Sequence, residues 1–591
     1  MSAVPSLPES LTVRSDAPHE DVLRRIDSAN HATNGLNGHA NKPTTSAHAE
    51  PSSTSLPNSA AFTLRQAPVE NFRPLRVIVV GAGYSGVYLG IRLPERLRNV
   101  QLRIYEKNDG IGGTWWENRY PGCACDIPSH SYQYSFEPNK DWSSLYAPAA
   151  EIQAYIERTA RKYGADRFIR LGHEVKECRY DFTNKRVGVI GSGSSAIQII
   201  PRLQKLPGTQ LSCFIRSKTW ISPPFGQEMW DKLGLTGFTI PDELKAKFKS
   251  DPEHYHKFRL AVEEDANSIH DVTIRGTPMN VGAKKAFEDH MRQRLAAKPE
   301  IFDALLPSFS PGCRRLTPGP GFLEALTEPN VSFITDPITG IEPRGVRTKD
   351  GKLHGIDALV CATGFHVSAP PPFPVIVDDP SNSSQNDPTK TKTKQSTTRT
   401  LRDHWRHRAT SYLSLATDGF PNLFMMLGPN SAIGSGSLTM MIESTGDYIV
   451  RCVRKIQRDN VRSMAVNPRR VRDFTQYVDA YFAGTVFAEE CRSWYRSGHD
   501  GRITGLWPGS TNHCIEALRS PRWEDFVYAY VGEDGGDGEE GNRMAWLGDG
   551  WSQKQRDGED LAFYLYPEFL DEPVPGRPEE KELYKVRPFS Y

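Results

Sequence analysis

The sequence has no long apolar run and no excess of charge of either sign. No segment contains the roughly 20 apolar residues that a membrane-spanning helix needs. The N-terminus lacks the apolar stretch of a secretory signal peptide, so we expect a cytoplasmic protein. The net charge of +1 and the lack of a basic stripe with interleaved aromatic residues argue against a nucleic-acid partner.

Cysteines are few for the length of the chain, and their number is odd. Nine cysteines in 591 residues do not suggest a framework of disulfides, so a reducing compartment fits best. Cys123 and Cys125 are separated by one residue, without a second Cys or His pair at the spacing of a zinc site. We therefore predict no metal centre.

Changes in composition indicate where the folded parts begin and end. Residues 1–70 are rich in Ser, Pro, Ala and Asn and are expected to form a disordered leader, with order beginning at Leu75. The stretch 379–400 has low complexity, which indicates a solvated loop. The Gly- and Glu-rich residues 531–591 are expected to be an irregular tail.

A first β-α-β unit carries a glycine loop of the kind that binds dinucleotides. A β-branched strand at 76–80 leads into the loop, a periodic helix follows at 85–97, and a second strand ends at Glu106. Glycines permit the tight turn, the close approach of a pyrophosphate and the packing of the helix on the strand. The Glu106 carboxylate would accept both ribose hydroxyls, which favours FAD or NAD over NADP. The three glycines are Gly81, Gly83 and Gly86.

A second β-α-β unit begins at the strand 186–190 and repeats this geometry, with alanine at the close-packing position. Its next strand ends at Arg216, Ser217 and Lys218 instead of an acid, and two cations suit the 2′-phosphate of NADPH. Two nucleotide sites in one chain predict a flavin that is reduced by a nicotinamide. The residues of this second loop are Gly191, Ser192, Gly193, Ser194, Ser195, Ala196, Ile197 and Gln198.

The sequence therefore predicts an α/β fold with two dinucleotide-binding, Rossmann-like domains and a helical insertion. Residues 71–185 would form the first part of the FAD-binding domain. Residues 186–355 would form the NADPH-binding domain, with a charged, mostly helical insertion at 227–310. Residues 356–530 would complete the FAD-binding domain.

Several motifs outside the two loops carry a family resemblance. Gly-Gly-Thr-Trp-Trp at 112–116 is followed by Arg-Tyr-Pro-Gly and Cys-Asp, Ala-Thr-Gly-Phe stands at 362–365, and Ser-Trp-Tyr stands at 493–495. Together these motifs closely resemble the class B flavoprotein monooxygenases of the Baeyer–Villiger type, over residues 75–530. Details such as Arg-Trp-Glu-Asp-Phe at 522–526 look most like the branch that serves fungal polyketide and mycotoxin pathways.

The resemblance implies roles for particular residues. One group would line FAD, a segment would pass between the two cofactors, one tryptophan would contact NADP, and an aspartate would orient a catalytic arginine. The residues implied along FAD are Gly113, Thr114, Trp115, Trp116, Glu117 and Tyr132. Those between the cofactors are Ala124, Cys125 and Asp126, the tryptophan is Trp494, and the nearest candidates for the arginine are Arg399 and Arg402.

The activity implied is the oxidation of a small-molecule ketone by O2 and NADPH to an ester or lactone. A flavin monooxygenase that hydroxylates nitrogen or sulfur would share both nucleotide loops, so product analysis must separate the two. A third alternative is a degenerate or wrongly joined flavin-fold chain without activity.

The third alternative rests on a short connection. Only 22 residues lie between Tyr163 and Arg186, where the family has several strands and the signature Phe-x-Gly-x-x-x-His-x-x-x-Trp. That signature is absent from the sequence, which looks like an excision that joins two family segments. An open parallel sheet without its later strands is expected to expose an edge and to lose half a core face.

Overall fold

The computed structural model describes only part of the chain. The described ranges are 65–172, 182–224, 230, 237–364, 370–371, 373–378, 398–497, 501–531, 543–567, 570 and 575–577. Most of the predicted leader and of the predicted loop at 379–400 lies outside them, as does Phe365. Within these ranges, no helix combines the length and the apolar character that crossing a membrane requires.

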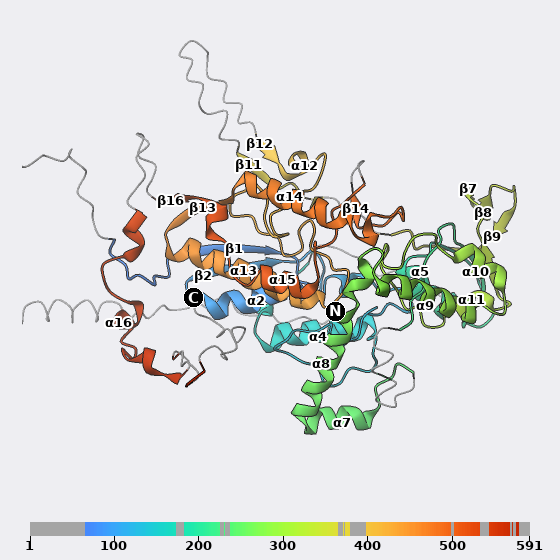
Figure 1. The fold of residues 1–591 in the computed structure, drawn as a ribbon, viewed down its shortest axis with the longest axis horizontal. Coiled ribbons are helices and arrows are strands. Elements are labelled where there is room, and N and C mark those ends of the chain that lie inside the picture. The colour runs from blue at the N-terminus through green and yellow to red at the C-terminus, as the bar shows by residue number, and fades with distance from the viewer. Residues whose placement is uncertain are drawn as a thin grey trace, which may run out of the picture. The chain divides into compact units, whose positions relative to one another are not determined.

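The first β-α-β unit forms the sheet that was predicted to bind FAD. Strands β1 (Leu75–Val80), β2 (Val100–Tyr105) and β3 (Ile169–Arg170) are parallel and neighbours in that order. Helices α2 (Tyr84–Arg96) and α13 (Leu438–Arg458) pack together against this sheet (Figure 1). A segment predicted to complete the FAD-binding domain thus returns to the first β-α-β unit, although more than 300 residues separate them.

The other face of this sheet is open. Side chains alternate along a strand, so Val79 faces the buried side while Ile78 and Val80 face the opposite side. Ile78 is 59% exposed, Val80 is 62% exposed, and Tyr105 on β2 is 44% exposed. Buried parallel strands are normally covered on both faces. The exposed face therefore agrees with the expectation that half a core face is lost.

The second β-α-β unit forms a separate parallel sheet. Its strand order is β10 (Ala358–Cys361), β4 (Arg186–Ile190), β5 (Gln210–Phe214), β6 (Val331–Ile334). Helices α5 (Ser194–Gln204) and α11 (Phe322–Thr327) contact each other, and their buried side chains belong to the same apolar cluster as those of β4 and β5. Two Rossmann-like sheets with flanking helices confirm the predicted fold class.

The described part of the predicted helical insertion is helical. Its helices are α7 (Asp242–Ser250), α8 (Pro252–Ser268), α9 (Pro278–Arg294) and α10 (Pro299–Leu305). The start of α8 is fixed by the side chain of Asp251, which accepts the His254 N–H at 2.9 Å, and by a proline at the first helical position.

The remaining elements connect and extend the two sheets. Thr398–Thr400 form a strand that pairs with another, so the end of the stretch predicted as loop, 379–400, is extended structure. The remaining helices are α3 (Thr114–Glu117), α4 (Ala149–Lys162), α12 (Leu401–His404), α14 (Pro468–Ala483), α15 (Thr511–Ala517) and α16 (Gln553–Asp557). The remaining strands are β7 (Ile338–Glu342), β8 (Gly345–Thr348), β9 (Leu353–Gly355), β11 (Ile376–Asp378), β12 (Thr398–Thr400), β13 (Val461–Val466), β14 (Arg496–Ser497), β15 (Arg502–Ile503) and β16 (Phe526–Tyr530).

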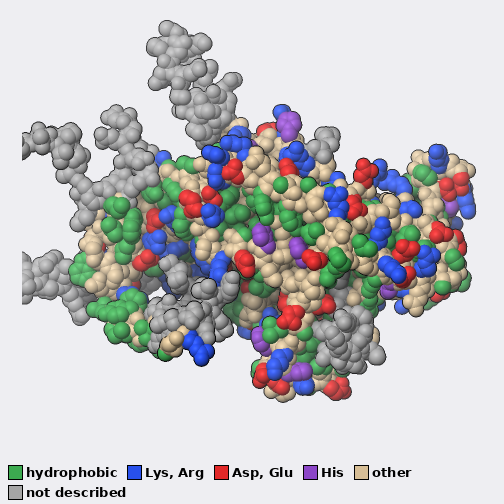
Figure 2. Space-filling model, in the orientation of Figure 1, with side chains coloured by type: hydrophobic (Ala, Val, Ile, Leu, Met, Phe, Trp, Pro, Cys, Tyr) green, Lys and Arg blue, Asp and Glu red, His purple; other side chains and the backbone are tan. Residues whose placement is uncertain are grey.

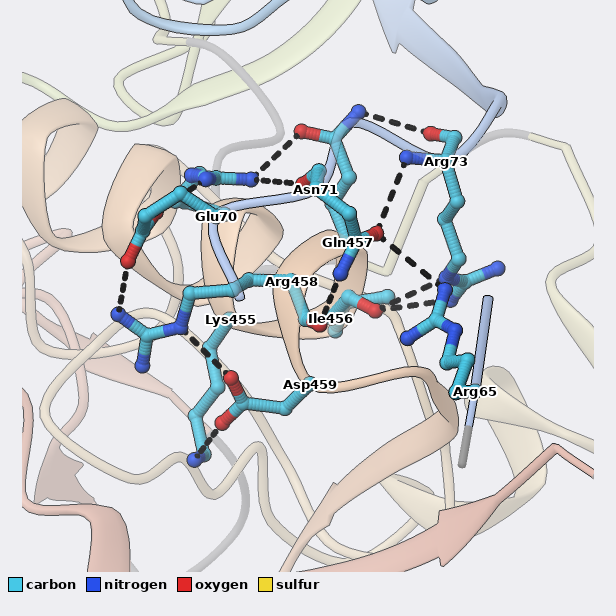
Figure 3. Close-up of polar contacts among 10 residues, drawn as sticks. Arg65, Glu70, Asn71, Arg73, Lys455, Ile456, Gln457, Arg458 and Asp459 are labelled. Atoms are coloured by element: carbon cyan, nitrogen blue, oxygen red, sulfur yellow. Dashed lines mark hydrogen bonds and ion pairs between the residues drawn. The ribbon is translucent and has the colours of Figure 1, made fainter. Parts of the chain in front are cut away.

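Ordered structure begins before the predicted boundary at residue 70. Figure 3 shows polar contacts that tie the segment before β1 to the C-terminal end of α13. The amide of Asn71 donates to the Arg458 carbonyl at 2.9 Å, and the guanidinium of Arg73 donates to the Ile456 carbonyl at 2.8 Å. Arg458 also pairs with Glu70 at 3.4 Å. Composition alone could not show these contacts, because their partners lie almost 400 residues away.

The segment around α16 carries many exposed apolar side chains. Hydrophobic side chains gather at this place in the lower left of Figure 2. Trp551 is 54% exposed and Leu565 is 63% exposed, and the Trp551 carbonyl accepts the Val69 N–H at 3.2 Å. The described part of the predicted irregular tail consists of short helical turns joined by irregular chain.

Candidate active site

The glycine loop after β1 forms a cradle at the N-terminus of α2. Gly81 has a φ of +98°, which glycine adopts without strain. A Cβ on Gly86 would lie 1.9 Å from the Gly81 carbonyl oxygen, so only glycine lets α2 approach the strand this closely. Apart from Gly81 and its two neighbours in the chain, no heavy atom of the described residues lies within 4 Å of a Cβ placed on Gly81, so the loop faces open space.

A second glycine pair closes this cradle from the opposite side. Gly113 has a φ of +56°, and a Cβ on it would lie 3.0 Å from the Cα of Gly83. Helix α3 begins directly afterwards and carries Trp115. The Trp115 indole N–H donates to the Tyr132 hydroxyl at 3.3 Å, and the two rings meet edge to face at 5.5 Å. The structure thus brings both predicted FAD segments to one place.

Glu106 lies at the end of β2, where a ribose would be held. It is 5% exposed, and its two oxygens accept the backbone N–H of Ala82 at 2.6 Å and of Asn108 at 2.9 Å. An ionised carboxylate offers about four acceptor positions, so each oxygen can still accept a ribose hydroxyl. The buried side-chain oxygen of Asn108 has no hydrogen-bond partner among the described residues.

Three of the residues implied along FAD have other contacts or are exposed. Glu117 forms an ion pair with Lys107 at 2.7 Å. The Trp116 ring lies against Gly110 and 4.4 Å from the guanidinium carbon of Arg119, and Thr114 is exposed. Their role in binding FAD stays a prediction.

The second loop faces a broad cleft, which we call the nucleotide cleft. Gly191 has a φ of +130°, and a Cβ on Gly193 would meet nothing within 4 Å among the described residues. The Ser194 hydroxyl shares a 2.7 Å hydrogen bond with Thr317. The described residues that line the cleft include Gly191, Ser192, Gly193, Ser194, Ser195, Ile197, Arg216, Ser217, Arg314, Arg315, Arg492 and Trp494.

The cations predicted to receive a 2′-phosphate are in different positions. Arg216 and Ser217 line the cleft. Lys218 is not among the lining residues and donates from Nζ to the Asp303 carbonyl at 3.4 Å. Ala196 is fully buried under the loop, as its close-packing position predicts.

One segment joins the two nucleotide units. The Tyr120 hydroxyl donates to the Gln198 side chain on α5 at 2.8 Å, and the Gln198 amide donates to the Ala124 carbonyl at 3.1 Å. Cys125 follows and is buried, and burial raises the pKa of its thiol. The chain therefore reaches Asp126 at a fixed position between the loops.

Asp126 holds an arginine that the sequence did not reveal. The Arg315 guanidinium donates to the two carboxylate oxygens of Asp126, from Nη2 at 2.7 Å and from Nε at 3.0 Å. The carboxylate raises the pKa of Arg315, so the guanidinium keeps its charge. Tyr495 lines the same space, and burial raises its pKa to about 12.

In the structure the Asp126 carboxylate is paired with Arg315 and not with the expected Arg399 or Arg402. The Arg399 guanidinium lies 5.4 Å from the centre of the Phe420 ring. Arg402 donates to the Pro371 carbonyl at 3.4 Å. The only local signal for Arg315 is a pair of arginines after Pro-Gly-Cys, in a stretch without periodicity.

Arg315 also lines a smaller hollow, which we call the apolar hollow. Its lining is largely apolar, with a few polar groups that could orient a bound molecule. The lining residues are Ile127, Pro128, Ser131, Asp265, Ala266, Ile269, Gly312, Arg314, Arg315, Leu316, Ile433, Gly434, Ser435, Gly436 and Tyr495. Arg315 and Arg314 line both this hollow and the nucleotide cleft.

A disulfide lies next to this arginine. Cys313 and Cys491 are bonded, with a separation of 178 positions in sequence and Cα atoms 6.2 Å apart. The odd cysteine count had favoured a chain without disulfides. The six other cysteines in the described residues are free.

Comparison with known proteins agrees with this arrangement. Residues 79–149 match the family described as an NAD(P)-binding Rossmann-like domain. The FAD-binding monooxygenase tazF of Aspergillus terreus is 34% identical over 569 residues, covering 84% of this chain and 96% of tazF. The chain belongs to the FAD-binding monooxygenases.

Two further proteins are similar to this FAD-binding monooxygenase. A Baeyer-Villiger monooxygenase of Pseudomonas aeruginosa is 26% identical over 505 residues, covering 74% of this chain and 88% of that protein. The structure of cyclohexanone monooxygenase from Rhodococcus sp. Phi1, bound to NADP+, has a TM-score of 0.60 at 22% identity. The match covers 78% of this chain and 100% of the cyclohexanone monooxygenase chain, and it shows that the two proteins share a fold.

The comparison with tazF also shows a difference in length between the two chains. The alignment extends over 569 positions, but it covers only 84% of the 591 residues of this chain. The alignment is therefore longer than the part of this chain that it covers. The relative therefore has residues without a counterpart in this chain.

Proposed function

We propose that this monooxygenase uses NADPH and O2 to convert a ketone to an ester or lactone in a Baeyer–Villiger oxidation. The observation that carries the proposal is the Asp126–Arg315 pair, because Arg315 lines both the nucleotide cleft and the apolar hollow. The likeness to the Pseudomonas Baeyer-Villiger monooxygenase supports the reaction type.

The residues present fit both cofactors. FAD would be held by the first glycine loop, by the buried Glu106 carboxylate, and by Trp115 and Tyr132. NADPH would be held by the second loop and by Arg216, with Trp494 at the edge of the same cleft. When bound and reduced by NADPH, FAD supplies activated oxygen, so that one atom of O2 enters the substrate and the other leaves as water.

The chain's own contribution centres on Arg315. Oxygen attack on a ketone places negative charge on the carbonyl oxygen, and a fixed cation next to that oxygen lowers the barrier. Asp126 keeps the guanidinium charged and holds its orientation through two hydrogen bonds. The largely apolar lining of the hollow would favour a carbon skeleton over water.

We further propose a polyketide-type ketone in fungal secondary metabolism, such as a mycotoxin pathway, as the substrate. Similarity to tazF, a fungal FAD-binding monooxygenase, supports this choice. The combination of apolar side chains with Ser131, Asp265 and Ser435 suits a largely apolar molecule with a few hydroxyl groups. The protein would act in the cytoplasm.

The test is a visible absorbance spectrum of the purified protein, followed by product analysis. Flavin bands that NADPH bleaches and air restores would support both cofactor sites. Polyketide ketones would then be screened by mass spectrometry for a product that is one oxygen atom heavier. An ester or lactone supports the proposal, whereas an N-oxide or S-oxide from amine or sulfide substrates would replace it with heteroatom hydroxylation.

A second candidate is a chain without activity, and the open face of the β1–β2 sheet favours it. Ile78 and Val80 are exposed where parallel strands are normally covered. A transcript that extends the region 175–190 would restore the absent family signature and identify the longer chain as the active form. A colourless protein that FAD cannot reconstitute would support this candidate.

A further inference from the structure

Three consecutive side chains tie the turn around Arg315 to three other parts of the chain. Cys313 is bonded to Cys491. The Arg314 guanidinium donates from Nε to the Cys491 carbonyl and from Nη1 to the Lys218 carbonyl, the latter at 3.2 Å. Arg315 pairs with Asp126. The position of Arg315 therefore depends on how its two neighbours are held.

The partner segment also carries groups that face the candidate site. Arg492 and Trp494 follow Cys491 and line the nucleotide cleft, and Tyr495 lines the apolar hollow. Beside the disulfide, the Glu489 carboxylate accepts the Ser310 N–H at 2.6 Å. The segment that carries Cys313 and the segment that carries Cys491 thus both line the space around Arg315.

We propose that the Cys313–Cys491 pair is a redox-sensitive clamp that positions Arg315 against the Ser493–Tyr495 segment. This inference rests on the proposed function of Arg315. Disulfides inside cells are typically transient or redox-sensing, and this one joins two segments of the candidate site. With the bond closed, the Arg314–Arg315 turn is fixed. With the bond reduced, the hydrogen bonds of Arg314 and the Arg315–Asp126 ion pair still hold the turn, but the covalent link is lost, so Arg315 is less well placed.

The chemistry of the switch is thiol–disulfide exchange with a low-molecular-weight disulfide, for which oxidised glutathione is the probe. One protein thiolate attacks the small disulfide and releases one small thiol, and the second protein thiolate displaces the other. Two protein thiols become one disulfide, and one small disulfide becomes two thiols. Cys313 and Cys491 are both almost fully buried, so incubation for hours is needed.

The test begins with a measurement that does not require activity. The full-length protein is equilibrated at a series of reduced-to-oxidised glutathione ratios, and free thiols are alkylated and identified by peptide mass spectrometry. We expect Cys313 and Cys491 to become labelled together as the ratio rises. Hydrogen exchange of residues 311–317 should increase in the same range. Labelling of both cysteines at every ratio, or exchange that does not change, would overturn the proposal.

Catalysis provides the second readout. Reduction should lower the yield of oxygenated product per NADPH consumed by roughly tenfold, because small misplacements of catalytic groups are costly. Flavin reduction by NADPH should change little.

Variants of the cysteines provide the controls. Cys313→Ser with Cys491→Ser should behave like the reduced protein at every ratio. Cys514→Ala, which removes a buried cysteine on α15, should keep the response to the ratio. A product yield independent of the ratio, despite closure of the bond, would also overturn the proposal. Failure of flavin reduction by NADPH in either redox state would instead count against the proposed function.

Discussion

The Arg315 guanidinium and the Asp126 carboxylate are 189 residues apart in sequence and form a two-point ion pair, at 2.7 and 3.0 Å. Asp126 follows the segment that joins the two nucleotide units, and Arg315 stands where the nucleotide cleft and the apolar hollow meet. The pair is therefore the point at which cofactor binding and substrate binding would be coupled.

Replacement of Arg315 should separate flavin reduction from oxygen transfer. Arg315→Ala removes the cation that would stabilise the developing oxyanion, so the rate of product formation should fall by roughly 10²–10³-fold. Stopped-flow absorbance should show flavin reduction by NADPH within a few-fold of the original rate. Arg399→Ala and Arg402→Ala are the matched controls and should retain product formation. A normal product yield from Arg315→Ala would remove Arg315 from the mechanism.

Structure formed by residues that are close in sequence was predictable, whereas contacts between residues distant in sequence were not. Both β-α-β units were predictable because strand, glycine loop, helix and second strand follow one another within about 30 residues. The Asp126–Arg315 pair was not, because the arginine lies in a turn without periodicity that only the tertiary structure brings to Asp126. The same holds for the Cys313–Cys491 bond, since connectivity cannot be deduced from cysteine positions.

Gly86→Ala should abolish FAD binding. The new Cβ would stand 1.9 Å from the Gly81 carbonyl oxygen, so α2 must move away from the end of β1. We expect the purified variant to be colourless and to unfold at a lower temperature. The control is Gly282→Ala on α9, where a Cβ meets nothing within 4 Å among the described residues. Alanine in an exposed helix should stabilise that variant by up to about 1 kcal/mol.

Arg216 should determine the preference for NADPH over NADH. Arg216→Ala removes the cation that lines the cleft after β5, and a lost charge-assisted contact should raise the KM for NADPH by roughly tenfold. The KM for NADH should not change. Lys218→Ala is the control, because Lys218 Nζ donates to the Asp303 carbonyl instead. An unchanged KM for NADPH in Arg216→Ala would show that the 2′-phosphate lies elsewhere.

His130 should make the stability of the protein depend on pH. Burial, followed by the nearby Arg259, lowers the pKa of His130 from 6.5 to about 3. The unfolded chain therefore binds a proton below pH 6.5 that the folded chain does not, and the free energy of unfolding falls as the pH falls from 6.5 towards 3.

Between pH 7 and pH 5 this histidine should lower the free energy of unfolding by roughly 2 kcal/mol. His130→Leu places an apolar side chain among Phe248, Tyr255 and Phe258. Unfolding in guanidinium at the two pH values should then show a smaller decrease in the free energy of unfolding. The exposed His256→Gln is the control and should keep the original dependence. An unchanged pH dependence in His130→Leu would assign the effect to other groups.

The open sheet face can be tested by polar substitution on neighbouring residues of one strand. Val80 is 62% exposed, whereas Val79 is 9% exposed and faces the helices. Val80→Thr should change the free energy of unfolding by less than about 0.5 kcal/mol, as surface substitutions do. Val79→Thr buries a hydroxyl among apolar side chains and should cost about 1–3 kcal/mol.

The comparison within β1 distinguishes an open face from a covered one. Denaturant unfolding of the two variants under the same conditions gives the difference directly, and binding of an environment-sensitive dye reports the exposed apolar surface. Ile78→Thr with Val80→Thr should lower dye binding without lowering stability. If Val80→Thr costs as much as Val79→Thr, the face is covered in solution, and the case for an inactive, shortened chain loses its structural support.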